Sequence, residues 1–92
     1  MYREVEIVNE MGLHARPAAE FVRCVQRFQS SITIRKEEEN FNAGSILEVL
    51  SACLDCGTRI TIEADGPDAE EALNQLAELL VKFKEEDQSE NH

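Results

Sequence analysis

Three short segments of the chain alternate apolar and polar residues with a period of two. They cover residues 5–7, 32–34 and 60–64, where valine, isoleucine or alanine is separated by a single glutamate or threonine. This period predicts β-strands that bury one face. Phe41, placed between Asn40 and Asn42, predicts the centre of a weak fourth strand.

Three other segments carry apolar residues at helical spacing. One begins at Pro17, a second at Asp68, and a shorter one runs from Ser45 to about Leu54. Spacings of three and four residues place their apolar side chains on one helix face. These side chains are Ala18, Phe21, Val22, Val25 and Phe28; Ala69, Ala72, Leu73, Leu76, Leu79, Leu80 and Phe83; and Ile46, Leu47, Val49, Leu50 and Leu54. Proline is compatible with the first turn of a helix, where its missing N–H has no intrahelical partner.

The order of the elements is therefore β-α-β-β-α-β-α. Helices that are apolar on one side only bury that side against one face of a small sheet. We expect an α+β fold, a two-layer open-faced sandwich with three helices on one face of a four-stranded antiparallel sheet. Its 92 residues make one domain, which we place at 1–84. Residues 85–92 form an acidic tail that we expect to be disordered.

Charge narrows the range of partners. Nine Lys and Arg stand against nineteen Asp and Glu, a formal net charge of −10, which disfavours binding to nucleic acid. No apolar run approaches the ~20 residues that span a bilayer, and the first residues lack the apolar core of a signal peptide. The three cysteines are an odd set, which favours thiols in a reducing compartment. We expect a cytoplasmic protein that does not insert into membranes.

The chemistry of the chain centres on His14. It lies in Gly12-Leu13-His14-Ala15-Arg16-Pro17-Ala18, directly before the helix that begins near Pro17. Backbone N–H groups at a helix start attract anions, phosphate in particular, and the guanidinium of Arg16 can grip phosphate oxygens in a bidentate manner. Gly12 permits a tight loop. Near neutral pH much of an imidazole is the unprotonated nucleophile. The motif thus offers a nucleophile and an anion cradle, although an ordinary polar loop would satisfy the same spacing.

This motif resembles the active-site signature of the HPr family, the histidine-containing phosphocarrier proteins of the phosphoenolpyruvate-dependent phosphotransferase system. The resemblance extends in order and spacing from Val5 to about Leu80. It includes Ser45-Ile46-Leu47, Val49-Leu50-Ser51, Gly57, Ile60-Thr61-Ile62 and Ala64-Asp65-Gly66.

The resemblance implies a sheet in the order 1-4-2-3. It also implies that His14 accepts a phosphoryl group on Nδ1 from enzyme I and donates it to an enzyme IIA protein. Arg16 would stabilise that group, and Gly12, Pro17 and Ala18 would form the phosphate-binding loop and helix start. Such a protein is a stoichiometric carrier rather than an enzyme, and we expect a monomer that uses no cofactor or metal.

Ser45 occupies the place of the family's regulatory serine, which a dedicated HPr kinase phosphorylates in some bacteria. Ser45 and Glu48 also match a helix capping box, which explains the serine by itself. The sequence departs from the family at Gly44, where lysine is frequent, and at Glu48, where glycine is frequent. Ile46, Leu47 and Leu50 would form the family's apolar contact patch for partner proteins, although some of these side chains could fill the core instead.

Two alternatives stay open at the level of sequence. The chain could serve a regulatory branch, nitrogen-related or otherwise unconnected with sugar transport, or it could be a binding module in which His14 does no covalent chemistry. Cys53 and Cys56 have C-x-x-C spacing, which suits a redox pair or half a zinc site. With Cys24 they do not complete a set of four ligands, so we expect one packed and one exposed thiol on a helix that ends near Gly57.

Overall fold

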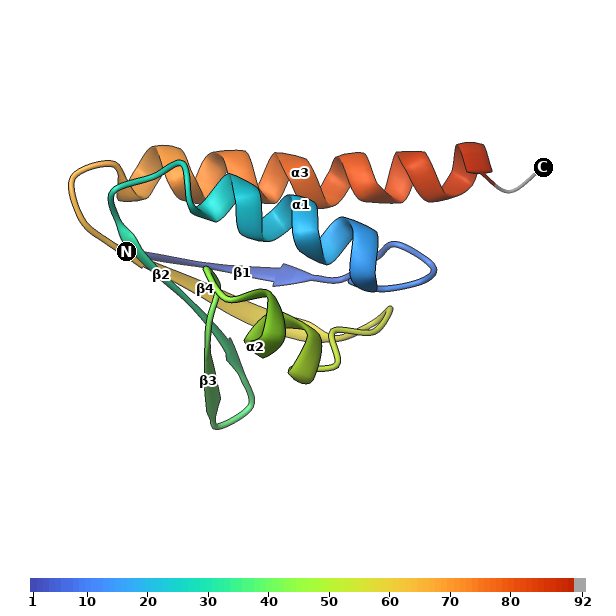
Figure 1. The fold of residues 1–92 in the computed structure, drawn as a ribbon, viewed down its shortest axis with the longest axis horizontal. Helices are drawn as coiled ribbons and strands as arrows, with labels where there is room; N and C mark the ends of the chain where they lie inside the picture. The colour runs from blue at the N-terminus through green and yellow to red at the C-terminus, as the bar shows by residue number, and fades with distance from the viewer. Residues whose placement is uncertain (91–92) are drawn as a thin grey trace.

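A computed structural model describes residues 1–90, with side chains described to residue 86. It contains the four strands and three helices that the sequence predicts, in the predicted order (Figure 1). The elements are β1 (Tyr2–Glu6), α1 (Ala15–Val25), β2 (Ser31–Lys36), β3 (Glu39–Asn42), α2 (Ile46–Ser51), β4 (Arg59–Asp65) and α3 (Ala69–Glu90).

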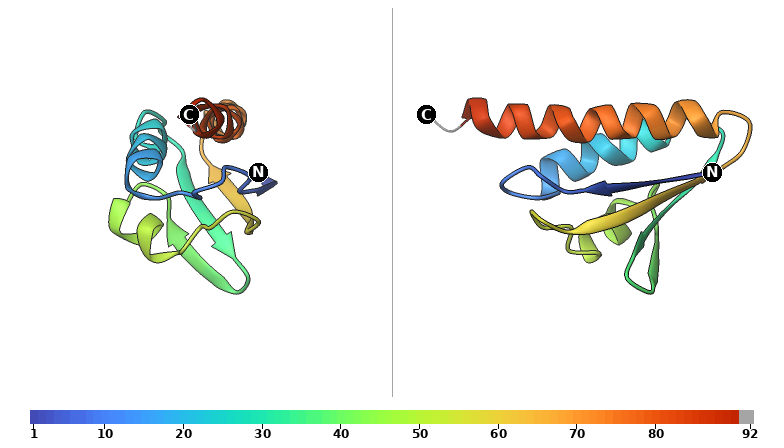
Figure 2. Two further views of the ribbon diagram at one scale, coloured as in Figure 1. Left: turned by 90° about the vertical axis from the view of Figure 1, so that its right-hand side faces the viewer. Right: turned by 180° about the vertical axis from the view of Figure 1, so that it is seen from behind.

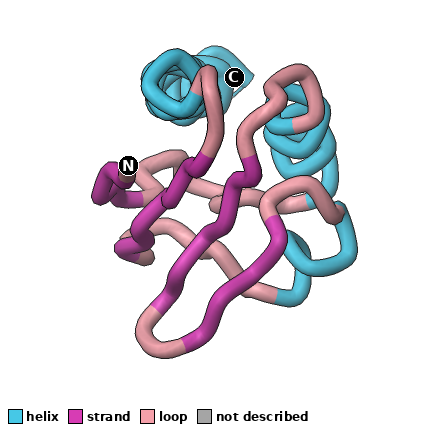
Figure 3. Tube along the Cα trace, turned by 90° about the vertical axis from the view of Figure 1, so that its left-hand side faces the viewer, coloured by secondary structure: helices cyan, strands magenta, loops and turns pink. Residues whose placement is uncertain are grey.

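The strands form one antiparallel sheet in the order β1-β4-β2-β3, which confirms the predicted topology. Ile34 lies at its centre, opposite Ile62 of β4 on one side and Phe41 of β3 on the other. The hairpin between β2 and β3 is a tight turn in which Glu37 has a φ of 57°. Figure 3 shows this hairpin projecting beyond the rest of the sheet.

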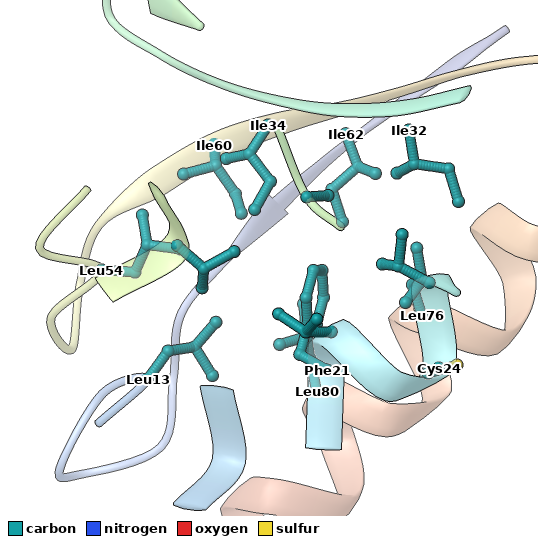
Figure 4. Packing of buried hydrophobic residues seen from close by; sticks show 14 of the residues in the cluster. Leu13, Phe21, Cys24, Ile32, Ile34, Leu54, Ile60, Ile62, Leu76 and Leu80 are labelled. Atoms are coloured by element: carbon teal, nitrogen blue, oxygen red, sulfur yellow. The ribbon is translucent and has the colours of Figure 1, made fainter. Parts of the chain in front are cut away.

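The core lies between the sheet and the helices. Ile32, Ile34, Ile60 and Ile62 project from the sheet toward Phe21 of α1 and Leu76 and Leu80 of α3 (Figure 4). Alternation along each strand leaves the opposite face of the sheet polar. On that face two ion pairs cross between strands, Arg35–Glu63 at 3.4 Å and Arg59–Glu6 at 3.7 Å. The helices therefore cover one face only (Figure 2).

The start of α1 and the end of α2 differ from the prediction. α1 begins at Ala15, two residues before Pro17. Proline is tolerated there because no N–H of the first turn has an intrahelical partner. α2 ends at Ser51, well short of Leu54. Its end is fixed by Lys36, whose Nζ donates to the carbonyls of Ala52 at 2.9 Å and Cys53 at 3.2 Å, and Cys53 itself turns the chain with a φ of 53°.

α3 is longer than expected. It continues to Glu90 and so takes in most of the segment that we expected to be disordered. Glutamate, lysine and glutamine are good helix formers, and a helix already started by packing propagates at little cost. Residues 91 and 92 lie outside the described part, and the domain boundary at residue 84 stays a prediction.

Candidate functional site

His14 is the N-cap residue of α1, and it is exposed. Its backbone is extended, with φ −79° and ψ −170°, and its carbonyl accepts the first helical hydrogen bond, from the N–H of Ala18 at 2.9 Å. Most N-cap side chains accept a hydrogen bond from their own helix, but the imidazole of His14 makes none. The ring is therefore available to a reactant at the N-terminus of α1, where the helix dipole is positive.

The loop that carries His14 is held by hydrogen bonds within it and by one to another loop. Asn9, which is buried, donates from Nδ2 to the carbonyl of Gly12, and the N–H of Gly12 donates back to the carbonyl of Asn9 at 2.9 Å. In addition, the N–H of Leu13 donates to the carbonyl of Leu54 at 2.8 Å. The loop is thus tied to the segment that follows α2, about forty residues away in the sequence.

The immediate surroundings of His14 include part of α3. A shallow hollow is lined by His14, Arg16 and Pro17 together with Glu20, Phe83 and Glu86. Arg16 is exposed and lies in the first turn of α1, whereas Pro17 and Ala18 are buried and fix that turn against the core. An anion in the hollow would meet one guanidinium and two carboxylates, so the helix terminus has to supply part of its attraction.

Ser45 is the N-cap residue of α2, as the sequence predicts. Its Oγ accepts a hydrogen bond from the N–H of Glu48, at a long 3.4 Å. The capping box is only half formed, because the carboxylate of Glu48 accepts from the N–H of Asn42 at 3.0 Å instead of from Ser45. Ser45 is partly exposed.

The predicted contact patch is on the surface of α2. Ile46, Leu47 and Leu50 are 36%, 78% and 40% exposed, whereas Val49 is fully buried. Val49 is therefore the residue of this helix that fills the core. α2 packs against α1, and His14 lies at the start of α1. The patch is therefore on a helix that neighbours the one carrying His14.

The cysteines differ from the expected arrangement. Cys53 and Cys56 are both exposed, and they lie in the loop after α2 because that helix ends at Ser51. The expectation of one packed and one exposed thiol was wrong. Cys24 is the buried one, and burial raises the pKa of its thiol, partly offset by Arg27. No cluster of three metal-ligating side chains occurs within the described residues. None of the described helices carries an apolar stretch of the length that spans a bilayer.

Comparison with known proteins gives consistent matches. Residues 1–82 match the family described as the PTS HPr component phosphorylation site. The phosphocarrier protein HPr of Vibrio cholerae is 40% identical over 78 residues, which cover 85% of this chain and 92% of that protein. The crystal structure of HPr from Thermoanaerobacter tengcongensis superposes with a TM-score of 0.87 at 37% identity, covering 91% of this chain and 94% of that one.

A related protein of another kind also matches. The crystal structure of Crh from Bacillus subtilis, described as a dimer with a swapping domain, has a TM-score of 0.72 at 39% identity. The match covers 87% of this chain and 92% of the Crh chain.

Fold and site define a class of small open-faced sandwiches with an exposed histidine at a helix start. The chain belongs to the HPr family of phosphocarrier proteins of the phosphotransferase system.

The structure places contacts around the predicted site residues that the sequence did not indicate. His14, Arg16 and Pro17 line one hollow, and Gly12 and Ala18 are their near neighbours in the chain. Sequence reasoning missed Asn9 and the carbonyl of Leu54, which hold the loop, as well as Phe83 and Glu86 from α3. The glycine at position 12 was a signal that some backbone approaches closely there. Nothing in the sequence indicated which.

Proposed function

We propose that this chain is a phosphoryl carrier that accepts a phosphoryl group on His14 from phosphorylated enzyme I and donates it to an enzyme IIA protein. The observation that carries the proposal is the exposed imidazole of His14. It lies at the positive end of α1 and makes no capping hydrogen bond to that helix. Membership of the HPr family supports the same role.

The transfer needs little from the protein beyond position and charge. Nδ1 of the unprotonated imidazole attacks the phosphorus in line, the bond from phosphorus to the donor nitrogen breaks, and the donor keeps its electron pair. Arg16 and the first-turn N–H groups of α1 balance the charge of the phosphoryl oxygens. A second transfer of the same kind regenerates His14. The chain thus acts as a stoichiometric carrier rather than as an independent enzyme.

Replacing His14 tests the proposal. With phosphoenolpyruvate and purified enzyme I, the wild-type chain is expected to gain one acid-labile phosphate, and His14→Ala is expected to gain none. Intact-mass spectrometry at neutral and acid pH measures both. His92→Ala is the matched control, because the chain has two histidines, and it should be labelled like the wild type. Labelling of His14→Ala at the wild-type level would disprove the role of this residue.

The partner surface follows from the same arrangement. Ile46, Leu47 and Leu50 form an exposed apolar patch on α2, a helix that packs against α1, and such patches mark protein contacts. We infer that enzyme I and enzyme IIA proteins dock there. The same helix carries Glu48, which places a negative charge on the docking surface. This charge favours partners other than those of sugar transport, so a role in a regulatory branch is the second proposal. The enzyme IIA protein that accepts phosphate from the labelled chain would identify the branch.

Ser45 is a second site of modification within this proposal. Its hydroxyl is partly exposed at the start of α2, so a kinase of the HPr type can reach it, and the first-turn N–H groups would attract the phosphate. Glu48 opposes this attraction through its negative charge.

The proposed carrier is a monomer in solution, although the Crh structure shows that this fold can also form a dimer.

A further inference from the structure

We propose that Cys53 and Cys56 form a thiol–disulfide switch that controls the loop carrying His14. Both thiols are exposed and only two residues separate them. Transient disulfides in reducing compartments usually have a sensing or catalytic role. Cys24 is only 9% exposed, so Cys53 and Cys56 are the two cysteines that a dissolved oxidant reaches most readily.

The loop with these thiols is the support of the His14 loop. Before Cys56 in the chain, the carbonyl of Leu54 accepts a hydrogen bond from the N–H of Leu13 at 2.8 Å. After Cys56, the N–H of Gly57 donates to the carbonyl of Ile7 at 2.6 Å, and the N–H of Ile7 donates to the carbonyl of Thr58 at 2.8 Å. The segment 7–13 is therefore hydrogen-bonded to residues on both sides of Cys56.

Packing makes this coupling tight. Gly12 lies so close to the loop that a Cβ atom there would be 2.6 Å from the carbonyl oxygen of Leu54 and 2.8 Å from Cα of Asp55. Leu13 and Leu54 both point into the core from their two loops (Figure 4). A movement of the Leu54–Asp55 backbone therefore has to move Gly12 and Leu13, the two residues before His14.

A disulfide between Cys53 and Cys56 would impose such a movement. The bond closes a ring of four residues and requires a Cα–Cα distance of about 4.4–6.8 Å with a fixed dihedral angle. The ring encloses the peptide of Leu54, whose carbonyl holds Leu13. The carbonyl of Cys53 is already engaged by the N–H of Asp55 at 2.9 Å and by Lys36. In the proposed switch, closing the ring turns the Leu54 carbonyl away from Leu13.

The chemistry needs a low-molecular-weight disulfide as oxidant. One of the two thiolates attacks a sulfur of that disulfide and releases one small thiol, which leaves a mixed disulfide on the protein. The other thiolate attacks the protein sulfur of the mixed disulfide and releases the second small thiol. In total, two protein thiols are oxidised to one disulfide and one small disulfide is reduced to two thiols.

Oxidised glutathione is the probe that tests the first half of the proposal. The full chain is expected to lose two hydrogens within the tryptic peptide 37–59, which contains both residues, and to carry no glutathione. Cys53→Ser and Cys56→Ser are each expected to retain one glutathione, because no second thiol resolves the mixed disulfide. If the wild type also stays glutathionylated, or if the new bond involves Cys24, the switch is disproved.

Hydrogen exchange tests the coupling without relying on phosphate transfer. In the oxidised chain the amide of Leu13 is expected to exchange about tenfold faster, because it loses its bond to Leu54, and the ring resonances of His14 are expected to shift. The double variant Cys53→Ser/Cys56→Ser, treated in the same way, should show neither change. Unchanged Leu13 exchange in a chain with a complete disulfide would overturn the coupling.

The last measurement rests on the proposed function. The rate of labelling by enzyme I is expected to differ between reduced and oxidised wild-type chain and to be the same for the treated and untreated double variant. If neither form is labelled, the carrier proposal fails while the exchange result still decides the switch. If both forms are labelled at one rate, the switch does not control transfer.

Discussion

At the scale of single residues, Gly12 is a position in the site loop that leaves no room for a Cβ atom. Its φ of +66° is a conformation that residues with a Cβ rarely adopt, and backbone atoms of Leu54 and Asp55 occupy the space that a Cβ would need. Gly57, on the facing loop, has a φ of +93°, but no atom lies within 4 Å of the place that a Cβ would take. An alanine at position 57 would therefore meet conformational strain alone, whereas an alanine at position 12 would meet both strain and steric overlap.

We predict that Gly12→Ala lowers the free energy of unfolding by about 3 kcal/mol and Gly57→Ala by about 1 kcal/mol. The difference between them reflects the overlap with Leu54, which only a backbone shift can relieve. Urea denaturation followed by circular dichroism measures both variants against the wild type. Equal losses would mean that the two loops separate without cost.

At the scale of elements, Asp68 joins α3 to the turn after α1. Its carboxylate accepts hydrogen bonds from the hydroxyl of Ser30 and from the backbone N–H groups of Gln29 and Ser30, both at 2.9 Å. These bonds lower the pKa of Asp68, the Ser30 hydroxyl contributing most. The residue therefore fixes where α3 begins and how that helix lies on the rest of the molecule.

This lowered pKa predicts a pH dependence of stability. Because the folded carboxyl binds its proton less readily than the unfolded one, Asp68 stabilises the fold above its ordinary pKa of about 4, and the contribution is lost as the pH falls through the folded value. Wild type is expected to be more stable than Asp68→Asn above about pH 5, with the gap closing below about pH 4.

Urea midpoints between about pH 2.5 and 7 measure this gap. Asp65→Asn, which removes an exposed carboxylate of β4, is the control for the change in net charge. A gap between wild type and Asp68→Asn that stays constant down to the lowest pH would contradict the assignment.

At the scale of the whole molecule, the excess of negative charge opposes the compact state. The formal net charge is −10, and like charges repel more strongly in the folded chain, where they are closer together. The two ion pairs on the polar face of the sheet are exposed, so each contributes at most about 1 kcal/mol. We therefore expect repulsion to be the larger electrostatic effect.

Salt is expected to stabilise this protein. Raising sodium chloride from about 10 mM to about 0.3 M shortens the Debye length from about 30 Å to below about 10 Å, which screens long-range repulsion more than contact pairs. The urea midpoint should rise, and potassium chloride should give the same rise if the effect is screening rather than binding of one ion. A midpoint that falls with salt would show that attractive pairs dominate.

Much of the fold could be predicted because its cause is local. The helical spacing of the apolar residues in α1 and α3 has to produce one buried face each, and the alternation in β2 and β4 has to do the same for the sheet. The strand order came from the family resemblance and not from these periods. The end of α2 was missed because it depends on Lys36, a residue of β2 whose ammonium group caps that helix.

The sequence by itself determined which groups meet at the start of α1, because Gly12, His14, Arg16 and Pro17 are neighbours in the chain and their distances are set by covalent geometry. Only the tertiary structure decided what surrounds them. The carbonyl of Leu54 against Gly12, and Phe83 and Glu86 beside His14, are contacts between distant segments. Such contacts follow from how the helices and loops pack on the sheet, which no local period of the sequence encodes.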